Sequence, residues 1–154
     1  MNKNYIKKIN TYIKQSNKEY TRKLIIDENG KIYFTDGFSV LSLFDTKYNR
    51  KNRNDIINNF EKDDNIMSKQ VINFYNNFSS QHFNKLAEIE KTENNYTFFK
   101  GNKKISFDNK KINRIAKIIS TDGNVSIFTS ENNNQTICLV GKNGCAFLLG
   151  CKVF

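Results

Sequence analysis

The sequence predicts one α+β domain made of two similar units, each a helix followed by three antiparallel strands, with a helical insertion between them. Apolar residues recur at helical spacing at two widely separated places, and short apolar runs with turn residues between them follow each place. The 154 residues contain no proline and suffice for one domain with its own core. We place unit one at 3–44, the insertion at 45–94 and unit two at 95–154.

The first segment of unit one has the pattern of an amphipathic helix. Its apolar residues follow the i, i+3, i+4, i+7 spacing of a single helix face, while lysines occupy another face. The apolar residues are Tyr5, Ile6, Ile9, Tyr12 and Ile13. The pattern therefore predicts a helix with one side against the core and one basic side.

Three strands are expected after this helix. Asn29 and Gly30 predict a tight hairpin between the first two strands, because both residues tolerate positive φ. Asp36 and Gly37 end the second strand and start the turn to the third. The three strands are expected over 22–27, 31–35 and 38–44.

The insertion is the least regular part of the sequence. Residues 45–65 are polar and predict a loop with room for a short helix at Ile56, Ile57 and Phe60. Ser68 and Ser80 are each placed to cap a further helix. The apolar residues of these two helices are Val71, Ile72, Tyr75 and Phe78 in the first, and Phe83, Leu86 and Ile89 in the second.

Unit two is predicted as a hairpin, a helix and three closing strands. The hairpin pairs 97–99 with 103–107 around a Lys-Gly-Asn turn, and the helix runs from Asp108 or Asn109 to Ile119. The apolar stripe of this helix consists of Ile112, Ile115, Ile118 and Ile119. The closing strands are expected over 125–129, 136–140 and 146–153.

The helices of the two units also share letters, since a Lys-Lys-Ile-Asn run begins at Lys7 and again at Lys110. This arrangement resembles one domain of a DNA sliding clamp, the ring-shaped processivity factor of replicative polymerases, in which each domain is two β-α-β-β-β units. The resembling stretches are RKLIIDENGKIYFTDGFSVLSLF over 22–44 and KISFDNKKINRIAKII over 104–119, with the closing strands to Phe154. The insertion is longer and more helical than the link in that family.

The positive charge is concentrated on or beside the two repeat helices. The formal net charge is +10, and residues 1–23 and 100–117 each contribute +6. The basic face would consist of Lys3, Lys7, Lys14, Lys18, Lys110, Arg114 and Lys117. The resemblance implies that this face contacts the phosphates of duplex DNA without reading bases. The alternative is that 25 Asn, 18 Ile and many lysines reflect AT-rich codons, and that these lysines are simply solvated.

We expect no catalysis, no cofactor and no metal. The single histidine, His82, has no evident partner for acid–base or nucleophilic chemistry. The three cysteines, Cys138, Cys145 and Cys151, lack the close pairs of a zinc site and are expected as reduced thiols. The acidic residues Glu61, Asp63 and Asp64 have the chemistry to hold Mg²⁺, but in an Asn-rich loop the expected state is solvation.

Two functions are favoured by these patterns, ahead of a third, a metal nuclease built on the acidic loop of Glu61, Asp63 and Asp64. The first is a non-enzymatic DNA-binding accessory factor of a phage or mobile element in an AT-rich bacterium. The second is a phage counter-defence inhibitor that binds a host CRISPR nuclease, or another defence protein, through the insertion. Its partner-binding residues would be Lys47, Arg50, Lys51, Arg53, Tyr75 and Phe78, although the helical spacing of the two aromatics is also typical of core.

Both functions place the protein in the cytoplasm of the host cell. The first 20 residues are lysine-rich and have no apolar core of a signal peptide. No apolar run approaches the ~18 residues needed to span a membrane. The expected partners are therefore duplex DNA or a protein–nucleic acid complex, with a host nuclease as the partner under the second hypothesis.

Overall fold

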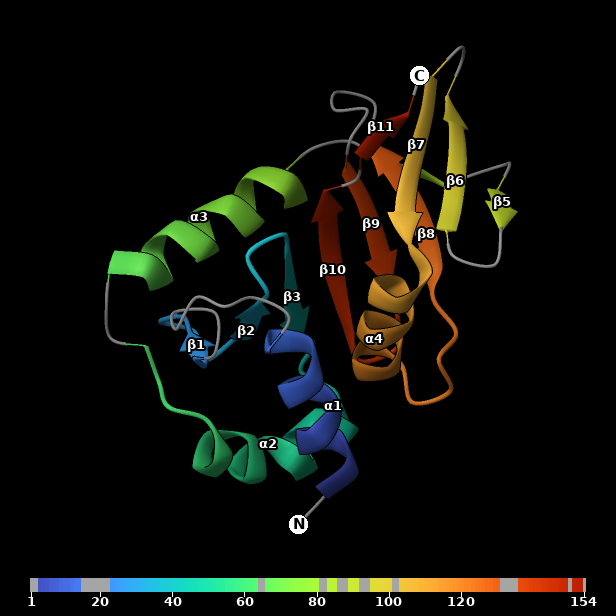
Figure 1. The fold of residues 1–154 in the computed structure, drawn as a ribbon. Helices are drawn as coiled ribbons and strands as arrows, with labels where there is room; N and C mark the ends of the chain where they lie inside the picture. Colours follow the sequence, from blue (N-terminus) through green and yellow to red (C-terminus); the bar gives the residue numbers. More distant parts are fainter. Residues whose placement is uncertain are drawn as a thin grey trace.

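The computed structural model describes residues 3–14, 23–63, 66–80, 83–85, 89–91, 95–100, 103–130, 136–149 and 151–153. Within these ranges the chain forms four helices and eleven strands, and the strands make two antiparallel sheets (Figure 1). The predicted α+β class is confirmed. None of the described helices has the length and apolar character required to cross a membrane.

Unit one has the predicted elements. They are α1 (Lys3–Ile13), β1 (Ile25–Ile26), β2 (Ile32–Thr35) and β3 (Ser39–Leu43). The predicted hairpin joins β1 to β2, and Gly30 has a φ of 82° that favours glycine. The Asp27 carboxylate closes the turn by accepting hydrogen bonds from the backbone N–H groups of Asn29 and Lys31, both at 2.9 Å.

Unit two differs from the prediction only at its end. Its elements are β6 (Asn95–Lys100), β7 (Lys103–Asp108), α4 (Asn109–Ile119), β8 (Ser126–Ser130), β9 (Thr136–Val140), β10 (Gly144–Leu149) and β11 (Cys151–Val153). The strand predicted over 146–153 is two strands, because the chain leaves one sheet at Leu149 and joins the other at Cys151. There β11 pairs with β7, which leads directly into α4.

The insertion is more ordered than predicted in its first half. The expected loop contains α2 (Lys47–Asn59), whose N-terminus is capped by Thr46 accepting from the Asn49 N–H at 3.2 Å. The next helix is α3 (Ile66–Ser79), so Ser68 lies in its first turn and is not its cap. The hydroxyl of Ser68 instead donates to an Asp63 carboxylate oxygen at 2.6 Å.

The helix expected after Ser80 is absent from the described residues. Two short strands, β4 (Phe83–Lys85) and β5 (Ile89–Lys91), stand in its place. Strand β4 pairs with β8 at one edge of the larger sheet, and β5 pairs with β6 in the smaller one. Pairing of β4 with β8, which is distant in sequence, and of β5 with the next strand β6 therefore overrides the local helical spacing.

The two units meet at the centre of a seven-stranded sheet of order β1-β2-β3-β10-β9-β8-β4. Leu41 of β3 lies opposite Ala146 of β10 in the antiparallel register. Phe34 lies opposite Leu41, and Leu139 lies opposite Ala146 in the same way. The two hairpins are therefore related by an approximate two-fold axis through the Leu41–Ala146 pair. The smaller sheet has the order β11-β7-β6-β5.

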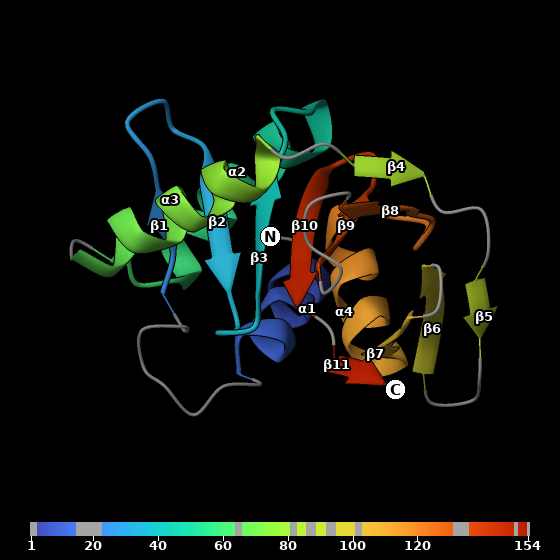
Figure 2. The same ribbon diagram turned by 90° about the horizontal axis from the view of Figure 1, so that it is seen from above.

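The helices cover both faces of the larger sheet. Figure 2 shows α1 and α4 side by side on one face and α3 across the other. The shared Lys-Lys-Ile-Asn run aligns the buried positions of the helix pair, since Ile9 and Ile112 are both buried, as are Tyr12 and Ile115. The outward sides of α1 and α4 are therefore equivalent surfaces of the two units.

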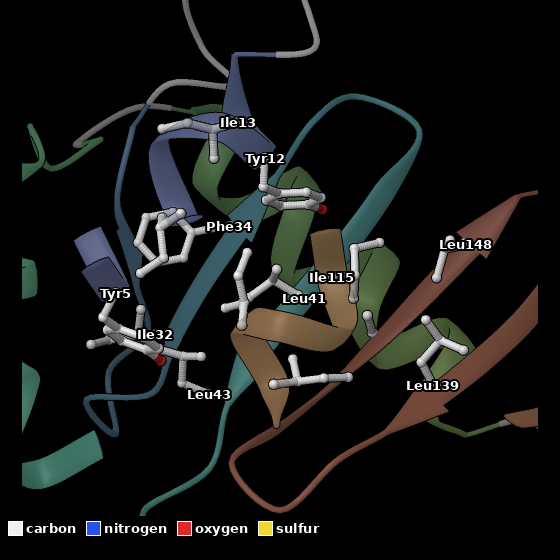
Figure 3. Close-up of a cluster of buried hydrophobic side chains, with 14 of the residues drawn as sticks. Tyr5, Tyr12, Ile13, Ile32, Phe34, Leu41, Leu43, Ile115, Leu139 and Leu148 are labelled. Carbon is white, nitrogen blue, oxygen red and sulfur yellow. The ribbon is translucent and has the colours of Figure 1, made fainter. Parts of the chain in front are cut away.

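The main core lies between the helix pair and the sheet (Figure 3). Tyr5 and Tyr12 of α1, Ile115 of α4, and Phe34 and Leu41 of the sheet are all at most 2% exposed. A second core lies under α3, where Tyr75 and Phe78 contact the ring of Phe147 from the opposite face of the sheet. Both faces of the central strands are thus buried.

The Leu41→Ala substitution tests the centre of the fold. Leu41 is fully buried where the two units meet, so removing its side chain leaves a cavity that the surrounding side chains fill only in part. We expect the free energy of unfolding, measured by urea denaturation, to fall by about 2–5 kcal/mol. Ile57→Ala is the control, because Ile57 is 39% exposed and should lose much less. Equal losses in the two variants would contradict the proposed centre of the core.

The Cys138 thiol should be protected in the folded protein. Burial, followed by the nearby Cys145, raises the pKa of the Cys138 thiol from 9.0 to about 12. Folding therefore stabilises the neutral thiol, a contribution fully present below pH 9.0 and lost as the pH rises towards 12. Because the thiolate is the nucleophile, iodoacetamide near pH 8 should leave Cys138 unmodified until urea unfolds the chain. Mass spectrometry of labelled peptides measures this, and rapid labelling of the native protein would contradict it.

Candidate nucleic-acid interface

The outward side of the α1–α4 helix pair is basic. Neither helix contains an aspartate or a glutamate. Of the residues predicted for this face, Arg114 is half-buried and Lys18 lies outside the described residues. The others are exposed, namely Lys3, Lys7, Lys14, Lys110 and Lys117. The structure therefore brings the described members of the predicted set onto one side of the molecule.

Four cationic side chains from the two helices line one groove. This groove of about 240 Å³ is lined by Asn4, Lys7, Lys8, Thr11, Arg114 and Lys117. A second hollow of about 430 Å³ continues along α1 and adds Lys3 and Lys14 to the same basic surface. We call the residues that line the first hollow, between the two helices, the basic groove. Its cations can reach an anion between the helices from either side.

The groove cations have no acidic counterpart in the part of the chain that the structure describes. The ion pairs found there join Lys23 to Glu61, Arg50 to Asp45, Lys111 to Asp36 and Lys142 to Asp122. None of these pairs involves Lys7, Lys8, Arg114 or Lys117. Because like charges repel one another in the groove, a bound anion would lower the electrostatic energy there.

Two lysines of the repeated run have different roles, which the sequence analysis did not separate. Lys8 lines the basic groove, although it was not among the predicted site residues. Lys111, at the equivalent place in α4, turns away and lies 3.2 Å from a carboxylate oxygen of Asp36. The repetition of the Lys-Lys pair was the available signal for Lys8. The partner of Lys111 is distant in sequence and gave no local signal.

Asp36 fixes the turn between β2 and β3 and connects it to the helix pair. This residue is fully buried, and one carboxylate oxygen accepts from the N–H groups of Phe38 and Ser39 at 2.9 and 2.8 Å. The same oxygen accepts from the Ser39 hydroxyl at 2.8 Å. The other oxygen has no hydrogen bond of good geometry and makes only the ionic contact with Lys111.

Tyr12 connects this turn to α1. Its hydroxyl lies 2.7 Å from the Ser39 hydroxyl. Because the Ser39 proton is directed at Asp36, Tyr12 is the donor in this bond. Burial, and then the negative charge of Asp36, raises the pKa of Tyr12 well above its usual value, so Tyr12 keeps its proton. The β2–β3 turn is therefore bonded to both helices of the basic face.

The basic residues predicted for partner binding lie on α2. Lys47 and Lys51 are exposed, and Arg50 pairs with the exposed Asp45 at 3.2 Å. Arg53 instead donates to the Gly30 carbonyl at 2.8 Å and fastens α2 to the first hairpin. A hollow of about 510 Å³ lies between α2 and that hairpin. Lys47 and Lys51 are thus the described members of this set that keep an unconstrained, exposed side chain.

The two aromatic residues predicted for partner binding lie in the core. Both residues belong to α3 and face the sheet. Tyr75 is 5% and Phe78 is 7% exposed, which leaves no ring surface for docking. The Tyr75 hydroxyl accepts from Ser42 at 2.7 Å and contacts the Cys145 sulfur at 2.8 Å. These residues therefore follow the core alternative that their helical spacing left open. The exposed aromatic of α3 is Phe74, at 45%.

Two of the three acidic residues considered for a metal, Glu61 and Asp63, lie in the part of the chain that the structure describes. Glu61 is exposed, whereas Asp63 is buried and accepts from Ser68. Asp64 and His82 lie outside the described residues, as does the side chain of Cys151. Among the residues that are described, no group of three or more His, Cys, Asp or Glu side chains could hold a metal ion.

Comparison with known proteins identifies no relative. No protein-family model, curated protein or solved structure matches this chain. The function therefore has to be inferred from the charge and geometry of the described surface.

Removing the Asp36 carboxylate should destabilise the fold. Asp36→Ala leaves the N–H groups of Phe38 and Ser39 without their acceptor and Lys111, whose side chain is only 22% exposed, without its counter-charge. We expect the free energy of unfolding to fall by about 3 kcal/mol in urea denaturation. Asp45→Ala is the matched control, because its pair with Arg50 is exposed and should contribute little. A loss no larger than that of the control would show that the Asp36 network does not hold the turn.

Proposed function

We propose that this protein is a non-enzymatic accessory protein that binds the backbone of duplex DNA through its α1–α4 face, without reading sequence. The observation that carries the proposal is the convergence of Lys7, Lys8, Arg114 and Lys117 on one groove between helices that contain no acidic residue. Phosphate oxygens are the ligands that such a set of lysine and arginine side chains recognises.

The shape of the face supports contact with the backbone and not with the bases. Both helices pack against the sheet along their apolar sides, and they lie next to each other (Figure 2). Reading bases requires a helix or a β-ribbon that enters the major groove of the duplex. Neither helix projects from the domain in that way. Contacts limited to phosphates position a protein on DNA but carry no direct sequence information.

The expected affinity is modest and strongly dependent on salt. Six cations line the basic groove and its continuation along α1, namely Lys3, Lys7, Lys8, Lys14, Arg114 and Lys117. If each meets one phosphate, the slope of log K against log salt is about −5 for duplex DNA. Affinity would then fall about a thousandfold between roughly 50 and 200 mM salt, and near physiological salt the dissociation constant would lie in the range of about 10⁻⁴–10⁻⁶ M that is typical of non-specific binding.

The order of elements gives the proposal further support. Two helix-and-strand units place their helices together on one face of the sheet, which gives the two basic helix sides a shared surface. The composition, rich in Asn, Ile and Lys, fits an accessory factor of a phage or mobile element with an AT-rich genome. The proposed contact needs one domain on the duplex and does not depend on a ring.

A second candidate function is inhibition of a host defence nuclease through the insertion. It is favoured by the exposed Phe74 and Ile57, which lie on α3 and α2 at 45% and 39% exposure. Aromatic residues are enriched at protein interfaces, and Phe74 on the insertion would be the anchor under this candidate. This candidate predicts that a partner protein, and not bare DNA, is retained.

A double substitution in the groove tests the proposed function. We expect Lys7→Ala with Lys117→Ala to weaken binding of a fluorescent blunt duplex and to reduce the salt slope by about 2, because two phosphate contacts are lost. Fluorescence anisotropy at several salt concentrations measures both effects.

Lys62→Ala with Lys69→Ala is the matched control. Both lysines are exposed, and Lys69 lies on α3, across the sheet from the basic groove. Each double variant removes two positive charges and changes the net charge from +10 to +8. Equal weakening of the two variants would indicate a diffuse field without a site. Absence of binding even at low salt would overturn the proposal and favour the nuclease inhibitor.

A further inference from the structure

We propose that the ring of Phe38 is a stacking site for an unpaired nucleobase at one end of the basic face. The protein would then prefer duplex DNA that borders a single strand over fully paired duplex. This inference rests on the proposed function and adds to it the kind of DNA structure that is recognised. It starts from a residue that neither the fold nor the phosphate contacts require.

Phe38 is exposed without being part of a loose loop. It is 62% exposed, the highest value among the large hydrophobic residues that the structure describes. The turn that carries it is held by the Asp36 carboxylate and by Thr35, whose hydroxyl donates to the Ser39 carbonyl at 2.7 Å. Gly37 has a φ of 91°, which side chains rarely adopt. Because the backbone of the turn is already held, little backbone freedom is lost when a ligand binds to the ring.

The surroundings of the ring match a nucleotide better than an apolar protein segment. The Lys111 ammonium lies 4.7 Å from the ring centroid and is only 3.2 Å from Asp36, so its position is also fixed. Because Lys111 lies over one face of the ring, the other face is the stacking surface for a base, and the cations of the basic groove supply the positive charge for its phosphate. Proteins that bind single strands combine these two features along a basic path.

The position of the turn connects Phe38 to the basic groove. Ser39 bonds to Tyr12 near the end of α1, and Asp36 contacts Lys111 near the start of α4. The β2–β3 turn therefore lies at the end of the helix pair where α1 ends and α4 begins (Figure 1). Lys14, exposed just after α1, continues the basic groove towards this end. A strand whose phosphates follow the groove can thus reach the ring with its next base.

Base pairing explains why an unpaired base is required. In an intact duplex both faces of each base are stacked on neighbours, and moving a base out of the stack costs energy. A base in a single-stranded tail is already free to stack on an aromatic side chain. The ring would therefore add affinity only at a junction or end, while the groove contributes equally to both kinds of DNA.

Binding of tailed and blunt duplexes tests this inference. The tailed duplex carries 2-aminopurine as the first unpaired base, and the blunt duplex has the same number of phosphates. We expect the full-length protein to bind the tailed duplex about tenfold more tightly, and stacking to quench the 2-aminopurine fluorescence. Phe38→Ala should abolish the preference and the quenching, while its affinity for blunt duplex and its salt slope stay unchanged. Phe38→Tyr should retain both effects.

A control variant and three possible results distinguish failure of the Phe38 stacking site from failure of the proposed DNA binding. Phe74→Ala removes another exposed ring, on α3 at the opposite face of the sheet, and should keep the preference. Equal affinity for the two duplexes, or a preference that survives Phe38→Ala, would overturn the stacking site alone, provided that blunt binding still depends on Lys7 and Lys117. Failure to bind either DNA would overturn the proposed function and the stacking site together.

Discussion

The antiparallel pairing of β3 with β10 is the interaction on which the rest of the structure depends. Each unit alone is one helix and three short strands, with too little apolar surface to form a core. Joining them at Leu41 and Ala146 makes one continuous sheet and relates the units by an approximate two-fold axis. That axis puts α1 and α4 together on one face, so the groove between them is a consequence of the strand pairing.

Covering the second face of the sheet determines the roles of several polar residues. Because α3 packs there, the central strands are buried on both sides, and Ser42 needs a partner in the core. The hydroxyl of Tyr75 accepts the hydrogen bond of Ser42 and contacts the Cys145 sulfur, which gives Ser42 a partner between α3 and the sheet. Tyr75 therefore belongs to the architecture of the fold.

Local signals in the sequence were sufficient for α1, the first hairpin and α4, whose apolar spacing and turn residues lie within each element. They were insufficient where an element depends on a distant partner. Tyr5 of α1 donates to the side chain of Asn49 in α2 at 3.0 Å across 44 residues, and β4 pairs with the distant β8 at the edge of the sheet. The same limit applies to the site. Periodicity identified the basic faces, but the contrast between Lys8 and Lys111 depends on Asp36, which only the tertiary fold brings near.

The arrangement of charge, more than its amount, separates a functional interface from codon bias. AT-rich codons add lysines wherever solvent tolerates them, and the isolated pairs Lys23–Glu61 and Lys142–Asp122 are what such a surface contains. Codon bias does not by itself exclude acidic residues from two helices that lie far apart in sequence, or bring Lys7, Lys8, Arg114 and Lys117 to one groove. Their mutual repulsion opposes folding. The presence of these four cations at the junction of the two units is understandable if an anion occupies the groove when the protein functions.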